Sequence, residues 1–269
     1  MVAARSSRTH PEAGREVVVW LSQRTLDAVI FDMDGVVTRT AGLHAVAWKQ
    51  LFDEFLEARR DAPGSYRPFD IEGDYRRYVD GKPRYDGVAS FLASRGIPLP
   101  YGSPDDSPGK DTICGLGNRK DALFHQTITK KGVDAYESTV RLIRRLRDAG
   151  IKTGIFSASR NAGRVLHAAG IVDLFDAKVD GVDAEKLSLP GKPSPETLVE
   201  LTRRLGASPA RTAVVEDAIA GVEAGRAGDF ALVIGVNRSE KPGVLLAKGA
   251  DVEVSDLSQV ELNVDAAEE

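Results

Sequence analysis

Residues 27–36, DAVIFDMDGV, place a short apolar run directly before two carboxylates and a glycine. The run from Asp27 to Phe31 predicts a buried strand, because four to eight apolar residues bounded by turn residues are typical of one. Asp32 and Asp34 alternate along the segment that follows, and a tight turn at Gly35 can leave both carboxylates near the same space. One of them can then act as a nucleophile while the other moves protons.

From about residue 137 the chain alternates helices with strands. We expect helices over 137–149, 161–169, 194–206 and 218–227, and strands over 152–156, 212–215 and 231–234. Strands that alternate with helices of this length indicate an α/β protein with a doubly wound, Rossmann-like and mostly parallel sheet, covered on both faces.

The middle of the chain, 41–136, interrupts this alternation and shows no convincing buried strand. We expect helices here over 43–55, 85–94 and 119–130, and a loop over 102–117 that is rich in proline and glycine. We interpret 41–136 as a helical cap, inserted after the first strand into an α/β core made of 25–40 and 137–269. Residues 1–24 carry no sustained period, so we expect a mobile or loosely packed N-terminal extension.

The composition excludes several classes of protein. The chain carries 36 Lys and Arg against 40 Asp and Glu, a net charge of -4, whereas nucleic-acid-binding proteins usually have a clear basic excess. Cys114 is the only cysteine, which fits a reducing compartment. No apolar run approaches the ~20 residues of a membrane span, and Val17 to Leu21 is too short for a signal peptide. We expect a cytoplasmic monomer or small homo-oligomer with no nucleic-acid or membrane partner.

Polar motifs follow the predicted strands at the ends where doubly wound sheets bind ligands. Ser-Ala-Ser-Arg-Asn at 157–161 follows one strand, Glu216-Asp217 closes another, and Lys192 precedes a helix capped by Ser194. Lys192 and Ser157 can hold the oxygens of a transferring phosphoryl group. Crowded carboxylates would repel a phosphate, so we predict a Mg²⁺ site with hard oxygen ligands. Its candidate ligands are Asp32, Asp34, Glu216 and Asp217.

Each motif alone has a plainer interpretation. Asp-x-Asp-Gly also occurs in ordinary turns and calcium loops, Lys192 alone would be a solvated loop lysine, and Glu216-Asp217 could cap the following helix. The calcium interpretation fails because the full ligand pattern, with a third Asp and a later Glu, is absent. The order of the motifs, each at a strand end, favours a catalytic site.

These segments resemble, in order, the four motifs of the haloacid dehalogenase superfamily over about residues 26–255. The helical insertion after the first motif resembles the subfamily that includes β-phosphoglucomutase. The resemblance implies catalysis by Asp32, Asp34, Lys192 and Ser157, with an aspartyl-phosphate on Asp32 and Mg²⁺ as the cofactor.

Finer details also resemble the mutases. Thr40, His44 and Trp48 match a pattern Thr-x-x-x-His-x-x-x-Trp, 157–161 is similar to Ser-Ala-Ser-Lys-Asn, and 81–84 lies where the mutases have Gly-x-x-Arg. Without the resemblance these would be packed or surface side chains. The resemblance implies that the substrate is bound by Thr40, His44, Trp48, Gly81, Lys82, Arg84, Lys120, Ala158, Ser159, Arg160 and Asn161.

The implied activity is interconversion of β-glucose 1-phosphate and glucose 6-phosphate by way of a bisphosphate. A phosphatase, in which water takes the phosphoryl group from Asp32, is the alternative, because fold and motifs do not separate the two. A non-catalytic regulatory module is a third interpretation. The four motifs are all intact, which argues against it. In every case the expected ligand is a small phosphorylated sugar.

Overall fold

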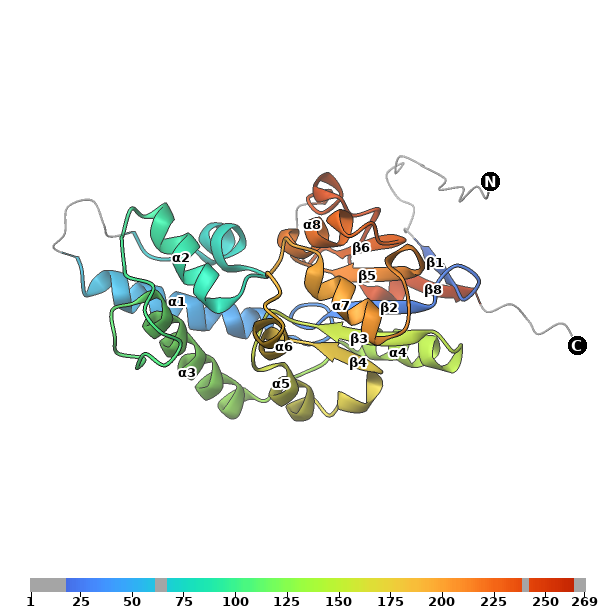
Figure 1. Ribbon diagram of the computed structural model, residues 1–269, viewed down its shortest axis with the longest axis horizontal. Coiled ribbons are helices and arrows are strands. Elements are labelled where there is room, and N and C mark those ends of the chain that lie inside the picture. Colours follow the sequence, from blue (N-terminus) through green and yellow to red (C-terminus); the bar gives the residue numbers. More distant parts are fainter. Residues whose placement is uncertain (1–17, 61–66, 239–241, 264–269) are drawn as a thin grey trace, which may run out of the picture.

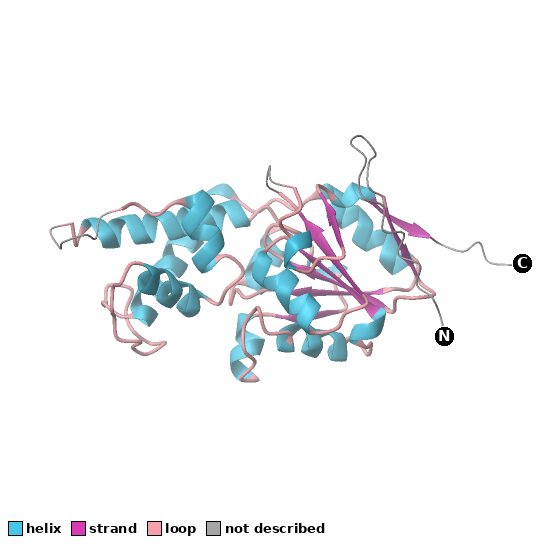
Figure 2. Cartoon of the chain, turned by 90° about the horizontal axis from the view of Figure 1, so that it is seen from above, coloured by secondary structure: helices cyan, strands magenta, loops and turns pink. Residues whose placement is uncertain are grey.

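A six-stranded, fully parallel sheet forms the centre of the computed structural model, which describes residues 18–60, 67–238 and 242–263. Across the sheet, the strands are β4 (Ala177–Val179), β3 (Lys152–Phe156), β2 (Ala28–Asp32), β5 (Thr212–Glu216), β6 (Leu232–Val236) and β7 (Val252–Val254). Helices cover both faces (Figure 2). The predicted doubly wound, parallel α/β fold is confirmed.

The apolar run at 28–31 is continuous because β2 is a central strand with a helical layer on each side. Val29 and Phe31 belong to the hydrophobic cluster that includes helix α4 (Glu137–Asp148) and helix α5 (Ala162–Ala168). Ile30 faces the opposite cluster, which includes helix α7 (Glu196–Arg204) and helix α8 (Ile219–Ala227). The register places Asp32 opposite Phe156, so the carboxylate emerges at the carboxyl edge of the sheet.

A second group of helices lies beside the sheet (Figure 1). It comprises α1 (Ala41–Glu57), η1 (Ile71–Val79), α2 (Arg84–Ser94) and α3 (Ile113–Lys131). These helices enclose their own core of aromatic rings, in which Phe52 and Phe91 lie 4.0 Å apart between ring centroids. The division into cap and core at residues 40/41 and 136/137 stays a prediction.

Residues 19–22, within the predicted N-terminal extension, form a strand. The expectation of a mobile or loosely packed segment was therefore wrong for these residues. β1 (Val19–Ser22) pairs in parallel with β8 (Val260–Asn263), and Leu21 is almost fully buried. No local pattern predicted this strand, because four residues show almost no period and the partner strand lies at the other end of the described chain. Residues 1–17 lie outside the described residues.

The expected loop over 102–117 was too long, since α3 begins at Ile113 rather than near residue 119. Thr112 caps the helix by accepting a hydrogen bond from the Gly115 N–H at 2.9 Å. Gly115 and Gly117 weaken the helical pattern, but both serve packing. A Cβ at Gly115 would lie 2.3 Å from the Lys110 carbonyl oxygen, and one at Gly117 would meet the Tyr85 ring at 2.6 Å.

The segment η1 is a π-helix that the sequence did not predict. The N–H of Tyr75 donates to the Asp70 carbonyl, and the N–H of Asp80 donates to the Tyr75 carbonyl, each five residues earlier. Such wide turns lack the 3.6-residue period and often accompany functional sites. This one ends at Val79, directly before Asp80.

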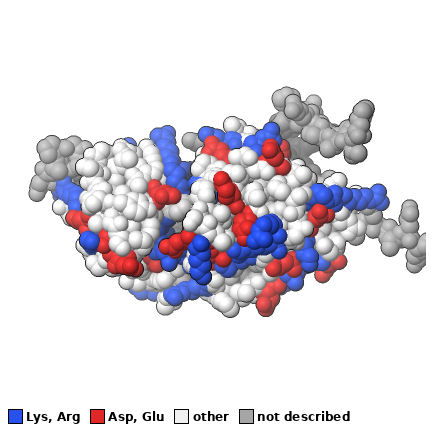
Figure 3. Space-filling view, viewed as in Figure 1, with Lys and Arg blue, Asp and Glu red and all other residues white. Residues whose placement is uncertain are grey.

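Short elements complete the chain: η2 (Val172–Leu174), α6 (Gly181–Lys186), η3 (Pro209–Arg211), η4 (Leu246–Lys248) and η5 (Leu257–Gln259). Basic and acidic side chains are interspersed on the face shown in Figure 3. None of the helices in the described part of the chain is both long and apolar enough to cross a bilayer.

Candidate active site

A cavity of 70 Å³ lies where the carboxyl edge of the sheet meets the helices around α1 and α3. Its lining contains most of the residues that the sequence singled out: Asp32, Asp34, His44, Trp48, Gly81, Lys82, Arg84, Lys120, Ala158, Ser159, Arg160, Asn161, Lys192 and Asp217. Thr40, Ser157 and Glu216 are buried and contact residues of this lining. The cavity therefore brings residues from both halves of the chain together.

A buried ionic cluster forms the sheet side of the cavity. The Nζ of Lys192 donates to Asp32 Oδ1 at 2.6 Å and also to Glu216 Oε1. Burial lowers the pKa of Lys192, but the attraction of the two carboxylates outweighs it and raises the pKa well above its ordinary value. Lys192 is therefore a fixed positive charge beside Asp32.

Asp32, Glu216 and Asp217 together fit a divalent cation. Each offers a carboxylate oxygen, and these oxygens lie within 4.8 Å of one another. Burial raises the pKa of Asp32 and Asp217 well above the ordinary value, and repulsion by neighbouring carboxylates adds to the rise, while Lys192 opposes it. The negative charge here exceeds what Lys192 alone can balance, and hard oxygen donors suit Mg²⁺.

Two glycines leave the space that these carboxylates occupy. Gly35 has φ +94°, and a Cβ there would lie 1.8 Å from Asp217 Oδ2. A Cβ at Gly221, in α8, would lie 1.7 Å from Glu216 Oε1. Any larger residue at either position would therefore displace a carboxylate of the group.

Asp34 lies apart from this group, in a pocket of hydrogen-bond donors. Thr40 Oγ1 donates to its Oδ1, Ser157 Oγ donates to its Oδ2 at 3.1 Å, and His44 Nε2 lies 3.2 Å from Oδ1. Burial raises the pKa of Asp34, but His44, Thr40 and Lys120 outweigh it and lower the pKa to about 2. Its role as a fourth metal ligand stays a prediction.

On the helical side of the cavity, Lys120 and His44 form a buried pair. Lys120 Nζ lies 2.5 Å from His44 Nδ1 and about 5 Å from the ring centroids of Trp48 (5.1 Å) and Phe124 (5.0 Å). Burial, together with the nearby Arg84, lowers the pKa of Lys120 to about 7. Burial and Lys120 lower the pKa of His44. The His44 ring thus lies between Lys120 and Asp34, with one ring nitrogen near each of them.

Arg84 is held at the cavity wall by a carboxylate that sequence reasoning missed. Its Nη1 lies 3.0 Å from Asp121 Oδ2, and Asp121 Oδ1 also accepts from Asn161 Nδ2 at 2.6 Å. Asp121 therefore joins a helix of the cap region to the loop after β3. The only signal in the sequence was its place directly after Lys120.

Other predicted residues of the lining have partners outside the cavity or shape its loops. Lys82 Nζ donates to Ser90 Oγ at 3.1 Å, and Arg160 forms an ion pair with Glu185 at 3.0 Å. Gly81 packs at the start of α8, where an added Cβ would lie 3.2 Å from that of Ala218. The other predicted loop residues, Ala158 and Ser159, line the cavity on the segment after β3.

Asp80 is a further carboxylate of the cavity that the sequence did not reveal. Burial and then Glu216 raise its pKa to about 6, opposed by Lys192 and by a hydrogen bond with Tyr75. It precedes Gly81 directly, yet neither its neighbours nor its spacing distinguished it from a surface residue.

Comparison with known proteins identifies the family. A sequence model described as a haloacid dehalogenase-like hydrolase matches residues 26–229. The chain belongs to this family. β-Phosphoglucomutase of Mycobacterium bovis is 41% identical over 255 residues, which cover 93% of this chain and 97% of that protein. Trehalose-phosphate phosphatase of Mycobacterium leprae is 38% identical over 128 residues, 46% of this chain and 28% of that protein.

A solved structure described as a putative β-phosphoglucomutase from Bacteroides vulgatus has a TM-score of 0.68 and 22% identity. The match covers 87% of this chain and 85% of that one. At this identity it supports the fold alone. The resemblance noted in the sequence is thereby confirmed, and this member of the family is an enzyme.

Proposed function

We propose that the enzyme interconverts β-glucose 1-phosphate and glucose 6-phosphate through glucose 1,6-bisphosphate, with an aspartyl-phosphate on Asp32. One observation carries the proposal. A single cavity has Asp32 and Lys192 on one wall, and the cations Arg84 and Lys120 on the other. A bisphosphate needs two phosphate sites that face each other, and cationic side chains on both walls support this interpretation.

In the first step, a carboxylate oxygen of Asp32 attacks phosphorus, and the bond from phosphorus to a sugar oxygen breaks. Asp34 serves the proton transfers at that oxygen. Ionised Asp34, which the lowered pKa favours, can accept a proton from an attacking sugar hydroxyl. The chain through His44 to Lys120 offers a path for returning a proton to Asp34 when a leaving oxygen must be protonated.

Asp32, Glu216 and Asp217 would hold Mg²⁺ in this scheme, with Asp34 as a further candidate ligand. When bound, the ion neutralises carboxylate and phosphate charge and orients the phosphoryl group. Lys192 stays next to Asp32 Oδ1 and keeps that side of the phosphate neutralised. Arg84 and Lys120 would grip the phosphate that is not reacting.

A phosphatase is the second candidate, favoured by the similarity to trehalose-phosphate phosphatase over part of the chain. It would use the same attack by Asp32, after which water would release phosphate. The two functions differ in whether the cavity excludes water while the sugar bisphosphate reorients.

The distinguishing experiment supplies β-glucose 1-phosphate, Mg²⁺ and a trace of glucose 1,6-bisphosphate, and measures both products. We expect glucose 6-phosphate with little inorganic phosphate, and loss of activity with excess chelator. Arg84→Ala should reduce isomerisation by about 100-fold but hydrolysis of a small aryl phosphate far less. Arg119→Ala is the matched control, because Arg119 pairs with Glu54 at the surface. Inorganic phosphate released in step with substrate loss, without glucose 6-phosphate, would establish the phosphatase instead.

A further inference from the structure

A second and larger cavity, of 340 Å³, adjoins the active-site cavity. The two share the lining residues Arg84, Ala158, Arg160 and Lys192, so they meet along one wall. The proposed reaction takes place in the smaller cavity of 70 Å³, and beyond Ser157 and the shared residues the lining of the larger cavity has no role in it. Its volume falls within the range of small-molecule sites.

We propose that the larger cavity is a subsite for an uncharged sugar ring, so that the enzyme also binds sugar phosphates extended by a second ring. This inference rests on the proposed function only for the placement of the phosphate in the smaller cavity. It adds a class of ligand, disaccharide phosphates, to the monosaccharide phosphates.

Aromatic rings and paired polar groups give the larger cavity the chemistry of a sugar site. Tyr85 and Tyr101 line it, with their ring centroids 6.3 Å apart in an edge-on arrangement. Such rings offer apolar faces to the C–H surface of a pyranose. Asp86 and Glu185 present carboxylate oxygens that accept hydrogen bonds from hydroxyl groups, and Arg160 supplies donors.

The charges of the larger cavity favour a neutral occupant. Its three basic side chains already have partners: Arg84 pairs with Asp121, Arg160 with Glu185, and Lys192 with Asp32 and Glu216. Asp86 lines the cavity at an exposed position, and its carboxylate would repel a second phosphate. A polyhydroxyl ring can donate hydrogen bonds to Asp86 without adding negative charge, whereas an anion there would be repelled by it.

The helical side of the cavity is built before any ligand arrives. Tyr85 Oη donates to Asn118 Oδ1 at 2.9 Å. The amide of Asn118 donates to the carbonyl oxygens of Pro104 and Asp106, each at 2.9 Å. The Cys114 N–H donates to the Tyr101 carbonyl at 3.0 Å. The loop that carries Tyr101 is therefore fixed to α3, so little ordering opposes binding.

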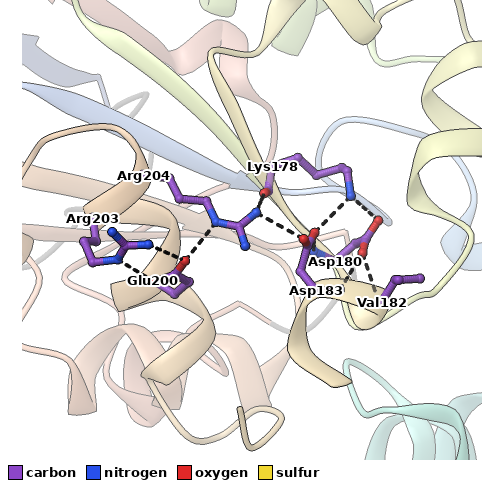
Figure 4. Close-up of polar contacts among 7 residues, drawn as sticks. All are labelled: Lys178, Asp180, Val182, Asp183, Glu200, Arg203 and Arg204. Atoms are coloured by element: carbon purple, nitrogen blue, oxygen red, sulfur yellow. Dashed lines mark hydrogen bonds and ion pairs between the residues drawn. The ribbon is translucent and has the colours of Figure 1, made fainter. Parts of the chain in front are cut away.

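The opposite side of the cavity is formed by α6, and an ion-pair network holds this helix (Figure 4). Lys178 contacts Asp180 and Asp183, and Arg204 of α7 contacts Asp183 at 3.2 Å. Asp180 caps α6 through the N–H groups of Val182 and Asp183. Glu185 is thereby placed at a defined position on the cavity wall.

The test compares affinities by titration calorimetry in the Asp32→Asn protein, which binds without turnover. The probes are β-maltose 1-phosphate and trehalose 6-phosphate, each against β-glucose 1-phosphate. We expect at least one disaccharide phosphate to bind about ten-fold more tightly, the effect of one ring contact and one or two hydrogen bonds. Tyr101→Ala and Asp86→Ala, both at exposed positions, should each reduce the ratio of the affinity for the disaccharide phosphate to that for β-glucose 1-phosphate. Trp20→Ala, an exposed aromatic on β1, should keep it.

The subsite is wrong if neither disaccharide phosphate binds more tightly than β-glucose 1-phosphate, or if the ratio survives both substitutions. The isomerisation assay on the wild-type enzyme reports separately on the proposed function. A ten-fold ratio in an enzyme that forms no glucose 6-phosphate would support the subsite and overturn the mutase.

Discussion

Two buried lysines on opposite walls of one cavity carry charge in different ways. Lys192, 7% exposed, touches the carboxylates of Asp32 and Glu216, which raise its pKa in spite of burial. Lys120, 6% exposed, touches His44 and two aromatic rings, and burial lowers its pKa to about 7. Burial disfavours the charged form of both lysines, so the groups next to each ammonium decide whether its pKa is raised or lowered.

The difference matches the tasks proposed for the two walls. A fixed cation suits the sheet side, where phosphoryl oxygens would lie during transfer. A lysine that gains and loses a proton near neutral pH suits the other side, where His44 connects it to Asp34. In the proposed mechanism, the sheet wall would supply a constant positive charge and the helical wall would supply a proton.

The largest effect should come from removing the nucleophile beside Lys192. Asp32→Asn should lower kcat by about 10⁴-fold or more, because an amide cannot form the acyl phosphate. Asp53→Asn is the control, since Asp53 lies on α1 paired with Lys49, outside the cavity. Both proteins should keep the circular dichroism spectrum of the wild type. An Asp32→Asn enzyme with more than a few per cent of wild-type turnover would contradict the mechanism.

Replacing each lysine by methionine tests the contrast itself. Lys192→Met leaves buried carboxylates without their cation and should lower the free energy of unfolding by about 3–5 kcal/mol. Lys120→Met removes a charge that burial already disfavours, so it should change that energy by less than about 1 kcal/mol or stabilise the fold. Urea unfolding in excess chelator measures both. Equal losses would show that the two lysines are equivalent.

A smaller effect should appear in the pH dependence of the free energy of unfolding. Between the folded pKa of Lys120, about 7, and its ordinary value of 10.5, the unfolded chain holds a proton that the folded chain lacks. Stability should therefore rise with pH across this window, by up to about 1.4 kcal/mol per pH unit from this group. The slope of the wild type minus that of Lys120→Met isolates the contribution. Identical slopes would mean that folding does not lower the pKa of Lys120.

How far the sequence predicted the molecule depended on whether the signal was local. The run before Asp32 and the helix–strand alternation after residue 137 have clear periods, so the parallel sheet could be predicted. Strand β1 could not be predicted, because its partner β8 lies more than 200 residues away. The start of α3 was misplaced because Gly115 and Gly117 are required by packing that only the folded chain reveals.

The same distinction holds for the candidate site. Asp32, Lys192 and Glu216 were found because they follow strands or precede a capped helix in a recognisable order. Asp80 and Asp121 were missed, although both line the cavity, because they lie on helical segments where a carboxylate is usually solvated. Asp121 contacts Arg84 and Asn161, and Asp80 contacts Tyr75. These contacts depend on how the helices of residues 41–136 pack against the sheet.

The most direct test of Asp32 as the phosphoryl acceptor is beryllium fluoride binding, followed by fluorine NMR with Mg²⁺ present. Beryllium fluoride bonds to a carboxylate oxygen and imitates an aspartyl-phosphate. Resonances of bound fluoride should appear in the wild type and in Asp34→Asn, since Asp32, Glu216 and Asp217 offer three carboxylate oxygens to the metal without Asp34. They should be absent from Asp32→Asn and from samples with excess chelator. Bound resonances of equal strength in Asp32→Asn would show that another residue accepts the phosphoryl group.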